Sequence, residues 1–138
     1  MNEYTYDTLS VGTQACFTAE VTAEKMAQFL SVTQDTNLLH NDDEFARSMN
    51  YDGRVAYGML TSSFLSTLAG VYLPGKYALI QRVEVEFPRP VYVGDTLTVK
   101  GVVKEKNDAF RILQLKVTIH NQNGELVCRG KMRVGVLR

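Results

Sequence analysis

One short polar loop places two residue types of acid–base chemistry near each other. Asp35 lies five residues before His40, with Asn37 between them, in the run QDTNLLHN at residues 34–41. A carboxylate and an imidazole brought together can orient one water molecule and move its protons, because imidazole gains and loses a proton near neutral pH. The spacing therefore predicts Asp35 and His40 as a catalytic pair. Spacing alone leaves a structural alternative open, in which Asp35 and Asn37 turn the loop and His40 is a satisfied polar residue.

A glycine opens the most apolar helical segment of the chain, in the run Ala56-Tyr57-Gly58-Met59. Free backbone N–H groups at a helix N-terminus bind anions and carbonyl oxygens, and glycine permits their close approach. A substrate carbonyl oxygen bound there would be stabilised as negative charge developed on it. Gly58 is therefore a candidate oxyanion-binding residue. The alternative is that Gly58 only lets the helix pack closely against a sheet.

Other catalytic patterns are weak in this sequence. No G-x-S-x-G elbow and no phosphate-binding glycine pattern is present. The carboxylates of residues 42–44 suit the start of a helix, where they oppose the helix dipole. Cys16 and Cys128 lie in strand patterns without metal-ligand spacing, and His120 lies on the polar face of a strand. We therefore expect neither a metal ion nor a cofactor.

The elements that must position these residues divide the chain into a helical front half and a strand-rich back half. Alternating apolar residues predict a strand at residues 13–21, and Thr22 is placed to cap a helix that runs to about Thr33. Residues 58–72 form the most apolar helix candidate and carry no charge, so we expect this helix to be buried. After Gly75 the apolar residues alternate, which predicts four long antiparallel strands.

Strands with one polar and one apolar face need a layer that covers the apolar face. The uncharged helix at residues 58–72 can supply that layer. We therefore expect an α+β fold in which an antiparallel sheet wraps around one long central helix. A length of 138 residues favours a single domain over residues 1–138, because domains usually have roughly 100–200 residues.

The overall composition excludes several classes of protein. Fifteen Lys and Arg residues balance fifteen Asp and Glu residues, and this zero net charge argues against a nucleic-acid-binding protein. No apolar run approaches the ~20 residues of a membrane helix, and the first residues show no signal-peptide pattern. We therefore expect a cytoplasmic protein without a membrane partner. Low net charge also makes self-association easier.

Several segments together resemble one known family. Residues 29–40, FLSVTQDTNLLH, followed after five further residues by Ala46, resemble the hydratase motif of the MaoC-like family. The likeness extends over nearly the whole chain and includes residues 11–12, 56–60 and 87–95. That family includes (R)-specific enoyl-CoA hydratases and related 3-hydroxyacyl-thioester dehydratases. The resemblance implies a hotdog fold and a homodimer that builds an acyl tunnel at its interface.

The resemblance also implies residue roles. Asp35 and His40 match the pair that holds a water molecule, which adds hydroxide to C3 and a proton to C2 of a 2-enoyl thioester. Gly58 matches the position whose N–H polarises the thioester carbonyl, and Asn37 matches an asparagine that organises the loop. Ser66 matches a serine close to the catalytic pair.

Three positions depart from the family pattern. Gln34 stands where glycine is usual, which is costly if the position needs a positive φ. Leu38 stands where proline is usual, so the loop loses a conformational restriction but no reacting group. Tyr57 stands where histidine or proline is common, and we expect it to line the substrate entrance.

Four functions remain open at the level of sequence. The first is reversible hydration of trans-2-enoyl-CoA to (R)-3-hydroxyacyl-CoA. The second is dehydration of 3-hydroxyacyl thioesters on acyl carrier protein, in fatty-acid or polyketide assembly. A basic rim would suit either carrier, and its candidates are Arg47, Arg54, Arg82 and Arg89. The other two are a hotdog acyl-CoA thioesterase and a non-catalytic protein that binds acyl thioesters.

Overall fold

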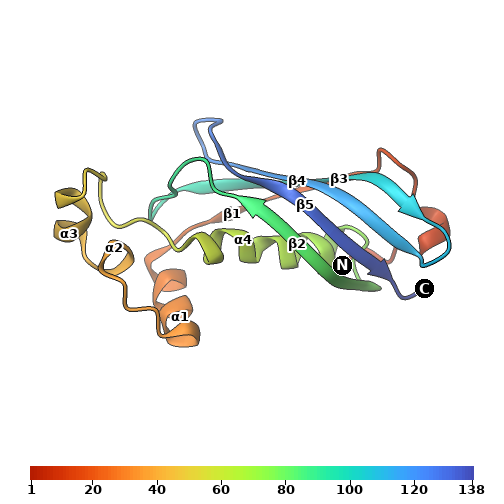
Figure 1. Cartoon of the computed structure of the whole chain (residues 1–138), viewed down its shortest axis with the longest axis horizontal. Coiled ribbons are helices and arrows are strands. Elements are labelled where there is room, and N and C mark those ends of the chain that lie inside the picture. The colour runs from red at the N-terminus through yellow and green to blue at the C-terminus, as the bar shows by residue number, and fades with distance from the viewer.

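The computed structural model describes all 138 residues. In chain order its elements are η1 (Tyr6–Thr8), β1 (Gln14–Glu20), α1 (Ala23–Thr33), α2 (Leu38–Asn41), α3 (Asp43–Ser48), α4 (Gly58–Thr67), η2 (Leu68–Tyr72), β2 (Ala78–Glu86), β3 (Thr96–Asn107), β4 (Ile112–His120) and β5 (Leu126–Val136). The five strands form one antiparallel sheet in the order β1-β3-β4-β5-β2. Figure 1 shows the sheet lying along α4, with α1, α2 and α3 beyond one end of it. The predicted α+β architecture is confirmed.

The sheet is built from the alternating segments that the sequence indicates. Along β4, buried and less buried residues alternate, with Leu113, Leu115, Val117 and Ile119 on the buried face. Because successive side chains of a strand point to opposite faces, this places one face of the sheet against the helix layer and the other in solvent. The inner face is therefore the hydrophobic core.

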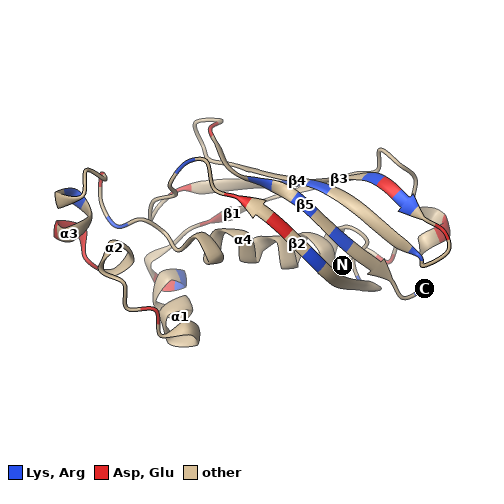
Figure 2. Cartoon of the chain, viewed as in Figure 1, with Lys and Arg blue, Asp and Glu red and all other residues tan.

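Helix α4 is the uncharged central helix that the sequence predicts (Figure 2). Leu60, Leu65 and Leu68 are buried on its sheet side and in the turn that follows. Gly101 of β3 lies under this contact, where an added Cβ would come within 2.8 Å of a Leu68 methyl carbon. The close contact of helix and sheet therefore depends on glycine at residue 101. The last turn, η2, is a wider π-type turn that completes the helix expected at residues 58–72.

The front half of the chain contains three short helices with side-chain caps. Thr22 accepts the Lys25 N–H at the start of α1, and Asp42 accepts the Phe45 N–H at the start of α3. Asn37 caps α2, so the polar loop expected over residues 34–41 contains one helical turn. None of the helices has the length and apolarity needed to cross a membrane.

Candidate active site

His40 lies on the one-turn helix α2 and is half-buried. Its Nδ1 lies 2.7 Å from the carbonyl oxygen of Val55. A carbonyl oxygen only accepts hydrogen bonds, so Nδ1 must carry the hydrogen in this contact. Nε2 of the neutral imidazole is then the nitrogen that is free to accept a proton. The backbone thus prepares His40 to act as a general base.

Asp35 lies in the exposed loop between α1 and α2. Its Oδ1 accepts the Asn37 N–H at 3.1 Å, which closes a tight turn toward α2. No ion pair links Asp35 directly to His40. The second carboxylate oxygen of Asp35 and Nε2 of His40 therefore both remain available to a substrate or a water molecule.

Asn37 organises the backbone between the two candidate catalytic residues. Its side-chain oxygen accepts the Leu39 N–H at 2.9 Å, and its carbonyl oxygen accepts the His40 N–H at 3.1 Å. These two bonds start the helical turn that carries His40. The side-chain oxygen of Asn37 is thus engaged in a hydrogen bond within the loop.

Tyr57 contacts both candidate catalytic residues. Its hydroxyl donates to the carbonyl oxygen of Asp35 at 2.9 Å, and its ring centroid lies 4.4 Å from that of His40. We expected Tyr57 to line the substrate entrance. The structure instead buries it, with 2% of the residue exposed, because its hydroxyl is held by the loop backbone.

Asn41 is a site residue that sequence reasoning missed. Its amide nitrogen donates to the carbonyl oxygen of Asn37 at 2.8 Å and to the hydroxyl oxygen of Tyr57 at 3.1 Å. The only sequence signal was its place directly after His40, and no spacing rule connects it with Tyr57 sixteen residues later.

Gln34 has a left-handed backbone conformation, at the position where the family usually has glycine. Its φ is 57° and its N–H donates to the Leu30 carbonyl at 2.7 Å, which ends α1. A residue with a Cβ pays roughly 1–2 kcal/mol for this conformation. The chain therefore carries local strain directly before Asp35.

The N-terminus of α4 presents unpaired amides. The backbone N–H groups of Gly58, Met59 and Leu60 have no acceptor within the chain, and the Tyr57 side chain provides no cap. A Cβ added at Gly58 would lie 3.5 Å from ring carbons of Phe87, which is an ordinary contact. Packing within the chain therefore does not require glycine here, which favours close approach of a ligand over the packing alternative.

His40 and Gly58 line the same groove, of about 360 Å³, although they are eighteen residues apart. The segment after β2 forms its other wall, including Phe87, Pro88 and Arg89. The groove therefore combines a histidine that is able to act as a general base with the unpaired backbone N–H of Gly58. That combination can activate water and stabilise negative charge on a nearby carbonyl oxygen.

Thr61 also lines the groove and was not singled out from the sequence. It lies three residues after Gly58 and is 1% exposed, and its hydroxyl oxygen has no hydrogen-bond partner. A buried hydroxyl without a partner is unfavourable for folding.

Ser66 lies apart from this groove. It is exposed and stands eight residues after Gly58, which corresponds to roughly 12 Å along the helix axis. Ser66 is not among the residues that line the groove with His40.

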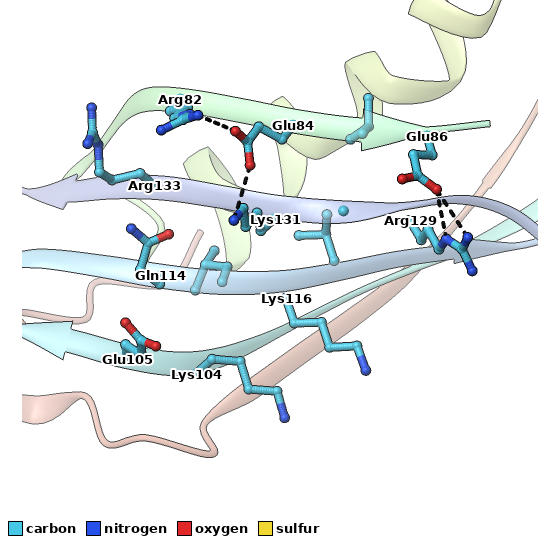
Figure 3. Close-up of a pocket in the computed structure, with 14 residues that line it drawn as sticks. Arg82, Glu84, Glu86, Lys104, Glu105, Gln114, Lys116, Arg129, Lys131 and Arg133 are labelled. Carbon is cyan, nitrogen blue, oxygen red and sulfur yellow. Dashed lines mark hydrogen bonds and ion pairs between the residues drawn. The ribbon is translucent and has the colours of Figure 1, made fainter. Parts of the chain in front are cut away.

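The four candidate arginines do not form one rim. Arg89 lines the groove and pairs with Glu125 at 3.0 Å, whereas Arg82 pairs with Glu84 on the outer face of the sheet (Figure 3). Arg47 lies in α3 and Arg54 lies in the following loop, and neither makes an ion pair. Only Arg89 borders the site directly.

A second groove, of about 810 Å³, lies on the outer face of β2–β5. Figure 3 shows it lined by charged side chains, with Glu84 bonded to Arg82 and Lys131, and Glu86 bonded to Arg129. The hydrogen bond from Lys131 holds the pKa of Glu84 below its usual value. The groove contains no histidine and no helix N-terminus, so it is a surface of ion pairs without an acid–base centre.

Comparisons with known proteins point to one family. The model of the MaoC like domain matches residues 10–124. An (R)-specific enoyl-CoA hydratase of Aeromonas caviae is 32% identical over 123 residues, covering 89% of this chain and 92% of that protein. A mitochondrial 3-hydroxyacyl-[acyl-carrier-protein] dehydratase of Arabidopsis thaliana is 28% identical, covering 86% of this chain and 72% of that protein. The solved structure of an R-hydratase of Pseudomonas aeruginosa superposes with a TM-score of 0.90 at 29% identity, covering 96% and 84% of the two chains.

Proposed function

The chain belongs to the MaoC-like domain family, and from that premise we propose that it is a hydro-lyase that reversibly hydrates trans-2-enoyl thioesters to (R)-3-hydroxyacyl thioesters. The hotdog-fold relatives with R-hydratase activity in their names support this reaction class. One observation of this structure carries the proposal. His40 and Gly58, whose N–H is unpaired at the start of α4, line one groove, and the Tyr57 hydroxyl that bonds the Asp35 carbonyl belongs to a ring packed on His40.

In the proposed hydration, Asp35 and His40 hold one water molecule between them. Nε2 of His40 takes a proton from the water because Nδ1 is committed to the Val55 carbonyl. The hydroxide forms a bond to C3, and the electron pair of the C2–C3 double bond moves toward the thioester carbonyl. The His40 imidazolium then returns the proton to C2. Water is added without net oxidation or reduction, and the reverse sequence is dehydration.

The N-terminus of α4 has a separate role in this proposal. As C3 is attacked, negative charge develops on the thioester oxygen, and donors fixed in advance stabilise it. The N–H of Gly58 is such a donor, since it has no acceptor within the chain and borders the groove. We assign Gly58 the oxyanion role and Asn37 the role of keeping the loop in shape.

We propose coenzyme A as the carrier of the acyl group, after the name of the Aeromonas caviae relative. Acyl carrier protein is the second candidate, because the Arabidopsis thaliana relative is named for it. Turnover of matched CoA and carrier-protein thioesters would separate the two. A higher kcat/KM with the CoA thioester would support coenzyme A, and a higher kcat/KM with the carrier-protein thioester would support the second candidate.

We further propose that the enzyme is a homodimer. Strand β2 is an unpaired edge of the sheet, and its apolar residues Leu79, Ile80 and Val83 are 50%, 38% and 43% exposed. Met59 at the start of α4 is 68% exposed. An exposed apolar edge strand of this kind favours pairing with a second chain. Ser66, which does not line the groove of its own chain, is then a candidate contribution to the site of the partner subunit.

The reaction is tested with purified protein and crotonyl-CoA. We expect loss of the enoyl-thioester absorbance, no release of free thiol, and the (R)-3-hydroxyacyl product on chiral analysis. Release of thiol from saturated acyl-CoA would instead identify a thioesterase. Binding of short, medium and long enoyl-CoAs with no change in absorbance would identify a non-catalytic thioester-binding protein.

A further inference from the structure

The loop that carries Asp35 has little to fix it from its own residues. Residues 34–38 are all exposed, so burial does not hold them. Gln34 is strained at a positive φ, and Leu38 lacks the φ restriction of a proline. A reacting carboxylate on such a segment needs support from elsewhere, because misplacement by about 1 Å can cost roughly a hundredfold in rate.

The side chains of Tyr57 and Asn41 supply that support through hydrogen bonds to the loop backbone. The Tyr57 hydroxyl donates to the Asp35 carbonyl at 2.9 Å, and Asn41 donates to the Asn37 carbonyl at 2.8 Å. The Asn41 amide also donates to the Tyr57 hydroxyl oxygen at 3.1 Å, so the two side chains form one connected set of bonds. The backbone on both sides of residue 36 is thereby held.

The same tyrosine fixes the histidine. Its ring packs against His40 on one side, at 4.4 Å and a tilt of 35°, and against Phe29, at 4.9 Å. Val55, two residues before Tyr57, accepts the hydrogen of His40 Nδ1. One short segment therefore sets both the plane and the hydrogen-bonded nitrogen of the imidazole.

We propose that Tyr57, acting with Asn41, is a positioning residue that holds Asp35 and His40 in register for the reaction. Tyr57 is buried and is not among the residues that line the groove, so it acts through the pair and not on the substrate. This inference rests on the proposed function for its effect on rate. The hydrogen bonds themselves do not depend on that function.

The test is Tyr57→Phe, which removes the hydroxyl and keeps the ring. We expect kcat for crotonyl-CoA hydration to fall by about 10- to 100-fold, because the Asp35 carbonyl loses its best donor. KM is expected to stay within about twofold, since no contact with the substrate is removed. Tyr72→Phe is the matched control. Tyr72 is partly buried and, like Tyr57, its ring packs against another aromatic ring, but its hydroxyl makes no hydrogen bond.

A coupled variant tests whether the two residues act together. If Tyr57 and Asn41 form one unit, Tyr57→Phe combined with Asn41→Ala should lower kcat little more than Asn41→Ala alone. Additive losses would contradict the joint action. A normal kcat for Tyr57→Phe would overturn the proposal, and so would a raised KM with unchanged kcat, which would make Tyr57 a substrate-contact residue.

Amide hydrogen exchange gives a readout that does not require turnover. The N–H groups of Asn37 and Leu39 are bonded within the loop, and Tyr57→Phe should speed their exchange while Tyr72→Phe should not. Unchanged exchange would overturn the proposal. If the wild-type protein showed no hydration but exchange still responded to Tyr57→Phe, the proposed function would fail and the positioning of the loop would stand.

Discussion

Single residues of the groove decide which atoms can react. The Val55 carbonyl holds Nδ1 of His40 and so directs Nε2 to the chemistry. The three unpaired amides of α4 supply donors that no other part of the chain uses. The proposed base His40 and the proposed oxyanion-binding residue Gly58 therefore come from separate segments that line one groove.

Thr61 gives a test of the groove at the same scale. Its buried hydroxyl has no partner, so Thr61→Val should raise the free energy of unfolding by about 1 kcal/mol, because it removes a desolvated polar group at nearly constant volume. Denaturant unfolding measures this change. A loss of stability would show that the hydroxyl is satisfied, and a fall in kcat in a stable variant would show that it contacts the substrate.

The candidate reacting residues were proposed from the sequence, and the residues that support them were not. Asp35, Asn37 and His40 stand close together in the chain, so spacing alone connects them. The bonds that link Tyr57 with Asn41 and with Asp35 join residues that are sixteen or more positions apart, and no periodicity encodes such contacts. Ser66 is exposed and does not line the groove with His40, so its place near the pair stays a prediction.

The secondary-structure elements differ in how far the sequence predicts them. The alternation of β3, β4 and β5 and the uncharged α4 were predictable, because each follows a single period over many residues. The one-turn helix α2 was not, since it depends on the Asn37 cap and not on an apolar face. The wall at Phe87 lies beside the start of α4, where a Cβ added at Gly58 would be 3.5 Å from the Phe87 ring.

Gln34 at the end of α1 provides the prediction at this scale. Gln34→Gly should raise the free energy of unfolding by about 1 kcal/mol, because relief of the positive φ exceeds the entropy cost of glycine. Since Gln34 contributes no reacting atom, kcat should change little. Thermal unfolding checks the first expectation, and a lowered melting temperature would mean that the left-handed conformation costs less than the freedom gained by the unfolded chain.

For the whole molecule, the exposed apolar residues of the β2 edge are the basis of the proposed dimer. We expect a dimer at micromolar concentration by light scattering. Val83→Glu should give a monomer, because it places a charge in the middle of the apolar edge. Phe110→Glu is the control, since Phe110 is 74% exposed but lies in the β3–β4 turn. A wild-type monomer, or a Val83→Glu dimer, would contradict the proposed interface.

The two histidines of the chain allow the most direct test of the central claim. His40 borders the groove, whereas His120 ends β4 on the sheet and lines neither groove. In an assay of crotonyl-CoA hydration, His40→Gln should lower kcat at least about a hundredfold, the contribution of a general base. His120→Gln should leave kcat within about twofold of wild type, as expected for a residue outside the site. Undiminished hydration by folded His40→Gln would contradict the assignment of His40 as the base.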